Sequence, residues 1–358
     1  MSGWISNADG VNVSELVDQR VGALIQIITP PTPLAGALQV AAIEALSINA
    51  MSGLEEEEMT AAFIGAMAAT IPWFADAFPT VFTPGFDWHK YSKSGRGITS
   101  EGSTGADFAL LIRLDHEVAR AAVFQAKPTS KDGSVDVHRI SPNRPAEGKL
   151  PQPQILRLAD HGLRLMPEGA LASDLTWVHY AAYQSESCFC IPLSSVESVI
   201  TAYRTSDKSI RPKLNNYIAE LSLANNPRMA DAAKAFASKL WADHNTRTIA
   251  RNSLSVDFVH LLTIGASTPW GFDAPGWFPL DGKAAIDDFV QRTSGFLRLI
   301  EAHVALPPTP ENTPTTESGA PQSPKGKIVA SLNKAAEGKD WTLKQTNSGK
   351  AVSRKLSL

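Results

Sequence analysis

The sequence predicts an α/β fold in which helices pack on a mixed sheet, and two observations lead to that class. Helical and strand-like segments follow one another over residues 54–184 in the order helix, extended segment, strand, strand, helix, strand. Hydrophobic residues make up 43% of the 358 residues and charged residues 19%, so the chain has enough apolar material for one large core with additions.

Helices are expected at the N-terminal end of the chain. Residues 12–50 divide into two helical stretches separated by the prolines at 30–33, because proline lacks a backbone donor and disfavours helix in the residue before it. A third helix, LEEEEMTAAFIGAMAAT, is expected over about residues 54–70, and it should end before Pro72. The core is expected to begin with this third helix.

An apolar hairpin is expected after an aromatic, glycine-rich segment. Its strands are the run FALLIRL that follows Asp107 and the run AAVF that precedes Gln125. A polar, proline-containing loop is expected over residues 128–150, followed by a helix in PQILRLADHGLRLM, where apolar residues have helical spacing. Residues 174–184 alternate and are rich in aromatic side chains, which predicts another strand.

The second half of the chain is expected to be mainly helical, with one more strand candidate, DFVHLLTIGAS at residues 257–267. Residues 325–358 hold eight lysines or arginines against two acids, a local net charge of +6. The predicted organisation is a helical segment (1–53), the core (54–193), a mainly helical extension (194–306), a Pro/Ser/Thr/Glu linker (307–326) and a small basic module (327–358).

Composition excludes several classes of protein. The formal net charge of -3 argues against indiscriminate coating of nucleic acid. Cys188 and Cys190, the two cysteines, cannot supply a disulfide framework or a four-ligand zinc site, and no HExxH-like spacing supports zinc hydrolysis. The N-terminus lacks the regions of a signal peptide, and no uninterrupted apolar run reaches membrane-spanning length, so a cytoplasmic protein without membrane contact is expected.

Polar residues at the open end of the hairpin carry the chemistry. Alternation places Gln125 and Lys127 on one face of their strand. If Leu114 pairs with Val118, antiparallel pairing sets Asp107 directly opposite Gln125. The Asp107 carboxylate, the Gln125 side-chain oxygen and the Ala126 carbonyl would then offer hard oxygen ligands to Mg²⁺. Lys127 would lie beside a water on the metal or beside a scissile phosphate.

These residues resemble the PD-(D/E)xK, or restriction-endonuclease-like, nucleases. Gly-Ala-Asp at 105–107 and Phe-Gln-Ala-Lys at 124–127 match the family's motif over a region of about residues 54–184, in the variant where glutamine replaces the usual acid. The proline of the family name is absent and Ala106 stands in its place. The resemblance implies a core of helix, three strands, helix and strand, with Mg²⁺ or Mn²⁺ as cofactor.

Such nucleases often carry an acid on the helix before the sheet. Thr60, Phe63 and their helical neighbours define the inward face, and Glu56 lies closest to that face, with Glu57 next. Acids in the first turn of a helix also simply favour the helix dipole, and that alternative stays open.

Further candidates have ordinary alternatives. Glu101 would add a ligand or be a solvated loop acid, and Gln154 would contact phosphate or be an exposed residue at a helix start. Lys90, Lys93 and Arg96 lie near aromatic residues, as in a nucleic-acid groove, or belong to a polar loop.

The sequence and the resemblance therefore predict a metal-dependent endonuclease that hydrolyses phosphodiester bonds in nucleic acid, with DNA favoured over RNA as the substrate. By the resemblance, such a nuclease is expected to act in bacterial restriction or antiviral defence, with a homo-oligomer or a defence-system protein as partner. The alternative is a catalytically inactive protein of the same fold that serves as a nucleic-acid-binding or scaffold subunit, because glutamine attracts a metal less strongly than glutamate.

Overall fold

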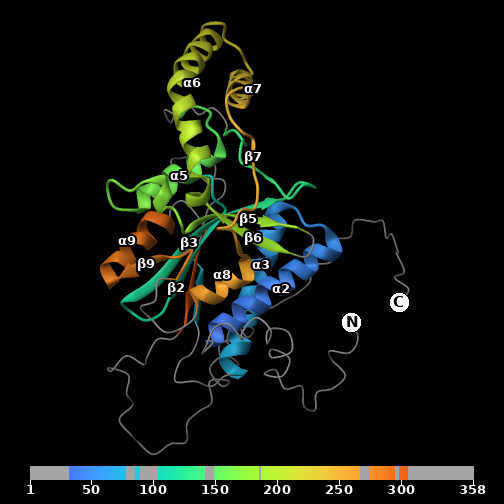
Figure 1. Ribbon diagram of the computed structural model, residues 1–358, viewed down its shortest axis with the longest axis vertical. Helices are drawn as coiled ribbons and strands as arrows, with labels where there is room; N and C mark the ends of the chain where they lie inside the picture. The colour runs from blue at the N-terminus through green and yellow to red at the C-terminus, as the bar shows by residue number, and fades with distance from the viewer. Residues whose placement is uncertain are drawn as a thin grey trace, which may run out of the picture. The chain divides into compact units, whose positions relative to one another are not determined.

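The computed structural model describes residues 32–77, 85–88, 104–141, 149–184, 187–266, 274–294 and 298–304 (Figure 1). All of them belong to one compact unit, Met1–Pro307, while Pro308–Leu358 form a second unit outside the described residues. The helix expected before residue 30, the linker at 307–326 and the basic module at 327–358 therefore stay predictions.

A mixed eight-stranded sheet forms the centre of the unit, in agreement with the predicted α/β class. Its strand order is β1-β10-β2-β3-β5-β6-β8, and β9 pairs with β3. Two neighbouring pairs, β10–β2 and β3–β5, are parallel, and the other pairs in the sheet are antiparallel. The strands are β1 (Gly85–Trp88), β2 (Phe108–Arg113), β3 (Val118–Pro128), β5 (Val178–Tyr183), β6 (Cys188–Pro192), β8 (Val256–Asp257), β9 (Phe278–Asp281) and β10 (Arg298–His303).

Helices cover both faces of this sheet. Side chains alternate along a strand, so Phe108 and Phe124 contribute to one core while Ala109 and Val123 contribute to the other. Helices α2 (Pro33–Ser52), α3 (Glu56–Ala77) and α8 (Phe258–Gly265) pack in the first core. Helices α5 (Gln154–Leu165), α6 (Glu197–Leu223) and α9 (Lys283–Ser294) contribute to the second. Figure 1 shows α2, α3 and α8 on one side of the strands and α5 and α9 on the other.

Helix α2 begins where the proline run ends. Thr32 is its N-cap and accepts a hydrogen bond from Ala35 N, and Pro33 occupies the first turn, where a missing donor costs little. By length and composition, Leu34–Ser52 is long and apolar enough to cross a membrane. The polar residues Gln39 and Glu44 interrupt it, so it is not an unbroken apolar run in the sequence. Most of that stretch is buried inside the protein, packed on α3 and α8.

Helix α3 does not end before Pro72, and that prediction is wrong. The helix continues to Ala77 with Pro72 inside it. Ile71 is 2% exposed and packs in the same core as Ile64 and Met67. Burial of this helical face holds the backbone in place despite the hydrogen bond that proline removes.

The segment predicted as a strand at residues 257–267 is mostly helix α8. Its residues are apolar on several sides, and an apolar run of this length does not by itself separate a buried helix from a strand. Asp257 accepts a hydrogen bond from His260 N and starts the helix. At the other end, Arg120 Nη1 donates to the carbonyl oxygens of Ile264 and Gly265, each at 3.0 Å.

The second half of the chain is mainly helical in the described residues, and it also supplies strands β8, β9 and β10 to the sheet. β10 lies between β1 and β2, so the last described strand separates two strands that are neighbours in sequence. Two-residue β7 (Thr248–Ile249) pairs with β4 (Val135–Asp136), which interrupts the loop predicted over residues 128–150. In the chain, α6 and α7 (Met229–Ala242) come before β7, and they form a helical hairpin that extends away from the sheet in Figure 1.

Candidate functional site

The β2–β3 hairpin has the register that the sequence predicts. Phe108 pairs with Phe124, Leu114 N donates to Val118 O, and Asp107 N donates to Phe124 O at 2.9 Å. Asp107 therefore comes just before β2, at the level of Gln125 on β3. The polar ends of the two segments meet at one edge of the sheet.

Three oxygen atoms converge on the side-chain amide of Gln125. Its Nε2 lies 2.6 Å from Asp107 Oδ2, 2.9 Å from Glu56 Oε1 and 3.0 Å from the carbonyl oxygen of Ala126. Gln125 is 1% exposed, and Ala126 N also donates to Asp107 Oδ2 at 2.8 Å. Oxygens from a helix and two strand ends thus surround one point at the end of the sheet.

An ammonium group lies beside these oxygens. Lys127 Nζ is 2.7 Å from Glu56 Oε2, and the side chains of Lys127 and Glu56 are only 7% and 19% exposed. Arg139 Nη1 lies 3.7 Å from Glu56 Oε1, from the segment after β4. Glu56 therefore joins the amide of Gln125 to two cations, and burial strengthens the ion pair with Lys127 relative to water.

The turn between α2 and α3 positions Glu56. Gly53 has a φ of +61° and ends α2, with its N–H bonded to Asn49 O. The Asn49 side chain accepts from Leu54 N at 2.9 Å and donates to the carbonyl of Gln184, at the end of β5, at 2.6 Å. Asn49 thereby fixes the start of α3 against the strand ends, although α3 itself packs across the opposite face of the sheet from Gln125.

Gly105 positions Asp107 against helix α5. Its φ is +70°, and a Cβ atom there would lie 2.9 Å from Gln154 O and 3.0 Å from Leu158 N. A side chain would therefore collide with backbone atoms, and only glycine allows this close approach. The Gly-Ala-Asp segment is held directly against the first turns of α5, which brings the Asp107 carboxylate to the end of β3.

The predicted site residues fall into three groups. Asp107, Gln125, Ala126, Lys127 and Glu56 are brought together. Glu57 is exposed, and Gln154 is buried at the start of α5, close to Gly105, with a side-chain oxygen that has no hydrogen-bond partner among the described residues. Outside the described residues lie Glu101, Lys90, Lys93 and Arg96.

Sequence reasoning missed Arg139, because it treated DVHRIS as part of a featureless polar loop. Arg157, on α5, donates from Nη2 to the Arg139 carbonyl at 3.3 Å and so helps to fix this segment. In the sequence, Arg139 is one cation within the loop expected over residues 128–150, and its contact with Glu56 is seen in the structure alone.

Two tyrosines of β5 also approach the site. Tyr180 pairs with Gln125 across the parallel strands, and Tyr183 pairs with Pro128. Burial raises the pKa of both hydroxyls; Arg157 partly opposes the rise at Tyr180, and the negative charge of Glu56 adds to the rise at Tyr183. Neither hydroxyl has a hydrogen-bond partner among the described residues. Both are therefore neutral O–H groups that stay protonated near neutral pH.

The donor set fits a hard divalent cation. In the described part of the chain, no three side chains of His, Cys, Asp or Glu converge on one point. The cluster at Gln125 has two carboxylates, those of Asp107 and Glu56, so a cation here would also need the neutral oxygens of Gln125 and Ala126. A half-turn of the Gln125 amide would replace its nitrogen by its oxygen, which makes the side chain a ligand instead of a donor.

No protein-family model, curated protein or solved structure matches this chain.

Proposed function

We propose that this protein is a metal-dependent nuclease of the PD-(D/E)xK type that hydrolyses phosphodiester bonds in nucleic acid. The observation that carries the proposal is the convergence of Asp107 Oδ2, Glu56 Oε1 and the Ala126 carbonyl on Gln125 Nε2, with Lys127 beside them. These oxygens are hard ligands of the kind that Mg²⁺ takes, and they now accept from the amide nitrogen of Gln125. Turning that amide would add its own oxygen to the set, and the adjacent ammonium favours a phosphate.

The proposed site divides the work among its residues. Asp107, Gln125, the Ala126 carbonyl and Glu56 would hold a Mg²⁺ or Mn²⁺ ion, which would supply Lewis-acid charge to a phosphoryl oxygen and lower the pKa of a water. Lys127 offsets the negative charge that develops as the water oxygen attacks phosphorus and the bond to the leaving oxygen breaks. The oxygen of the water and one of its protons end as a hydroxyl on phosphorus. The other proton of the water passes to the leaving oxygen.

Glu56 and Gln154 have supporting roles in this proposal. Glu56 holds the Lys127 ammonium at the end of β3 by the 2.7 Å ion pair. Gln154 has its backbone carbonyl against Gly105, and we assign its buried side-chain oxygen, which has no hydrogen-bond partner among the described residues, to a water of the site. The substrate we propose is DNA, and the setting we propose is antiviral defence in a bacterial cytoplasm, with a second copy or a defence-system protein as partner.

A second function is favoured by the same contacts. Both carboxylates already have partners in Gln125 and Lys127, so the cluster is satisfied without a metal. A protein of this fold that only binds nucleic acid, or serves as a scaffold, would need no metal at this cluster.

Cleavage assays distinguish the two functions. The full chain is incubated with supercoiled plasmid, single-stranded DNA and RNA in Mg²⁺, Mn²⁺ or EDTA. Asp107→Asn is tested beside the wild type, since it keeps the size of the side chain and removes its charge. Metal-dependent cleavage that Asp107→Asn loses supports the nuclease. Binding without cleavage of any substrate in either metal would support the binding subunit and refute hydrolysis.

A further inference from the structure

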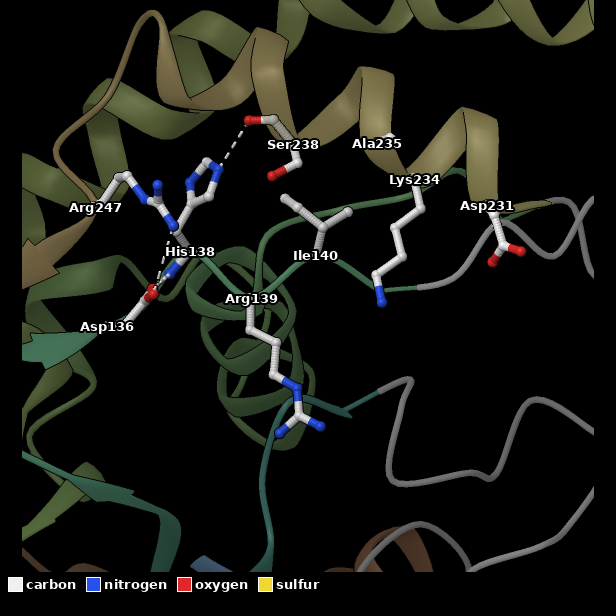
Figure 2. Close-up of a pocket in the computed structure, with 9 residues that line it drawn as sticks. All are labelled: Asp136, His138, Arg139, Ile140, Asp231, Lys234, Ala235, Ser238 and Arg247. Atoms are coloured by element: carbon white, nitrogen blue, oxygen red, sulfur yellow. Dashed lines mark hydrogen bonds and ion pairs between the residues drawn. The ribbon is translucent and has the colours of Figure 1, made fainter. Parts of the chain in front are cut away.

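A cavity of about 300 Å³ lies next to the proposed site, between the segment after β4 and helix α7 (Figure 2). Its charged walls are Asp136 and Arg139 on one side and Asp231 and Lys234 on the other, with Arg247 at one end. Arg139 belongs to both places, because it lines the cavity and its Nη1 lies 3.7 Å from Glu56 Oε1. Arg139 is therefore the residue that links the cavity to the proposed catalytic cluster.

The negative charges of the cavity are largely balanced. Asp136 accepts from His138 N at 2.7 Å, and its Oδ2 lies 3.8 Å from Arg247 Nη2. Asp231 lies in the first turn of α7, where the helix dipole favours a carboxylate. Two further cations lie on opposite walls: Arg139, which also pairs with Glu56 outside the cavity, and Lys234.

Arg139 and Lys234 are accessible from the open side of the cavity. The Arg139 side chain is 67% exposed, and Lys234 is exposed and has no ion-pair partner among the described residues. Figure 2 shows both side chains extending in the same direction, Arg139 from the strand segment and Lys234 from α7. An elongated anion could contact both.

The two walls are held in a fixed relation by a buried histidine. His138 Nε2 lies 3.1 Å from the carbonyl of Ser238 on α7, and its Nδ1 lies 3.0 Å from the hydroxyl of Tyr203 on α6. Tyr203 in turn stacks on Trp241 of α7, with ring centroids 5.7 Å apart. These contacts join the strand segment that carries Arg139 to the helical hairpin that carries Lys234.

We propose that this cavity binds the phosphodiester backbone of the substrate strand beside the scissile phosphate, with Lys234 and Arg139 as the phosphate contacts. The inference rests on the proposed function and adds to it the surface that the substrate follows. A strand that leaves Lys127 passes Arg139 and then Lys234, so the α6–α7 hairpin becomes the arm that holds the nucleic acid. The overall charge of -3 makes such local cations the means of attracting a polyanion.

Lys234→Ala tests this proposal, with Lys239→Ala as a matched control on the same helix. Lys239 is also exposed but does not line the cavity. Binding of the full chain to labelled single-stranded and duplex DNA is measured by fluorescence anisotropy in EDTA at several salt concentrations, so that no cleavage is needed. Loss of one phosphate contact should weaken binding by roughly 3- to 10-fold near 0.1 M salt and lower the slope of log K against log salt by about 1.

The outcomes separate this inference from the proposed hydrolysis. Weaker binding and a lower slope for Lys234→Ala, with Lys239→Ala like the wild type and Lys234→Arg close to it, support the inference. If Lys234→Ala matches Lys239→Ala in affinity and slope, or if the wild type binds no nucleic acid, the inference is wrong. A wild type that cleaves while Lys234→Ala binds normally leaves the nuclease proposal intact. A wild type that never cleaves but depends on Lys234 for binding refutes hydrolysis alone.

Discussion

The ammonium of Lys127 lies 2.7 Å from Oε2 of Glu56, although 71 residues separate them in the chain. This ion pair joins the end of β3 to the first turn of α3, which packs on the other face of the sheet. Together with the amide of Gln125, it gathers the acid, amide and lysine of the proposed site at one edge.

Lys127→Ala should reduce cleavage by about 100-fold or more, because it removes a charge that stabilises the transition state. Glu56 keeps contacts with Gln125 and Arg139, so the loss in stability should be only about 1–2 kcal/mol. Cleavage rate and melting temperature are measured together. Lys131→Ala, in the exposed turn after β3, is the control, and equal rates for both variants would contradict the assigned role.

Glu56→Gln should lower activity far more than Glu57→Gln. Both changes remove one negative charge from the same helical turn, so any effect of the helix dipole is shared. Glu56 contacts both Lys127 and Gln125, whereas the Glu57 side chain is exposed. The ratio of the two cleavage rates is the measurement, and a ratio near 1 would leave Glu56 as an ordinary acid at a helix start.

Gln125→Glu should become dependent on metal for its stability. The substitution places a third carboxylate beside those of Asp107 and Glu56 at a site that is 1% exposed, which should cost several kcal/mol in EDTA. Mg²⁺ binds the folded state and should restore much of the melting temperature, with saturation at lower Mg²⁺ than the wild type needs. A low melting temperature that Mg²⁺ leaves unchanged would refute the metal site.

Gly105→Ala should destabilise the protein by roughly 2 kcal/mol or more and impair cleavage, because the added methyl group meets backbone atoms of α5 and the φ is positive. Gly169→Ala is the control, since Gly169 also has a positive φ, +92°, but nothing within 4 Å of the added atom. Chemical denaturation gives the two free energies of unfolding. The difference between them isolates the close approach that positions Asp107.

Stability should fall as the pH is lowered from about 6.5 toward 4, because burial lowers the pKa of His179 to about 4. In that range the unfolded chain binds a proton on this imidazole and the folded chain does not, so acid favours unfolding. The slope of the free energy of unfolding should reach about 1.4 kcal/mol per pH unit for this group. His179→Gln should reduce the slope, and an unchanged slope would contradict this role of His179.

Local patterns were enough to predict that Asp107 and Gln125 lie side by side at the ends of β2 and β3. Alternation along FALLIRL and AAVFQAK placed the strands, and a short loop set the register that aligns Asp107 with Gln125, because antiparallel pairing leaves no freedom once the turn is known. The helical period favoured Glu56 over Glu57 as the acid that points toward the sheet, and the contacts of Glu56 agree with that choice.

Contacts between distant segments decided the rest. The apolar run after Asp257 is a helix because it is buried on several sides and capped at both ends. Asp257 is a local signal for a helix start, but the burial and the contact with Arg120 depend on the tertiary structure. Helix α3 continues past Pro72 because Ile71 packs in the core. Strand β10 pairs with β2, in the register Arg298–Phe108, although the two strands are far apart in the chain. Arg139 reached Glu56 through the same kind of contact, since the energy of burying and pairing groups depends on which surfaces meet.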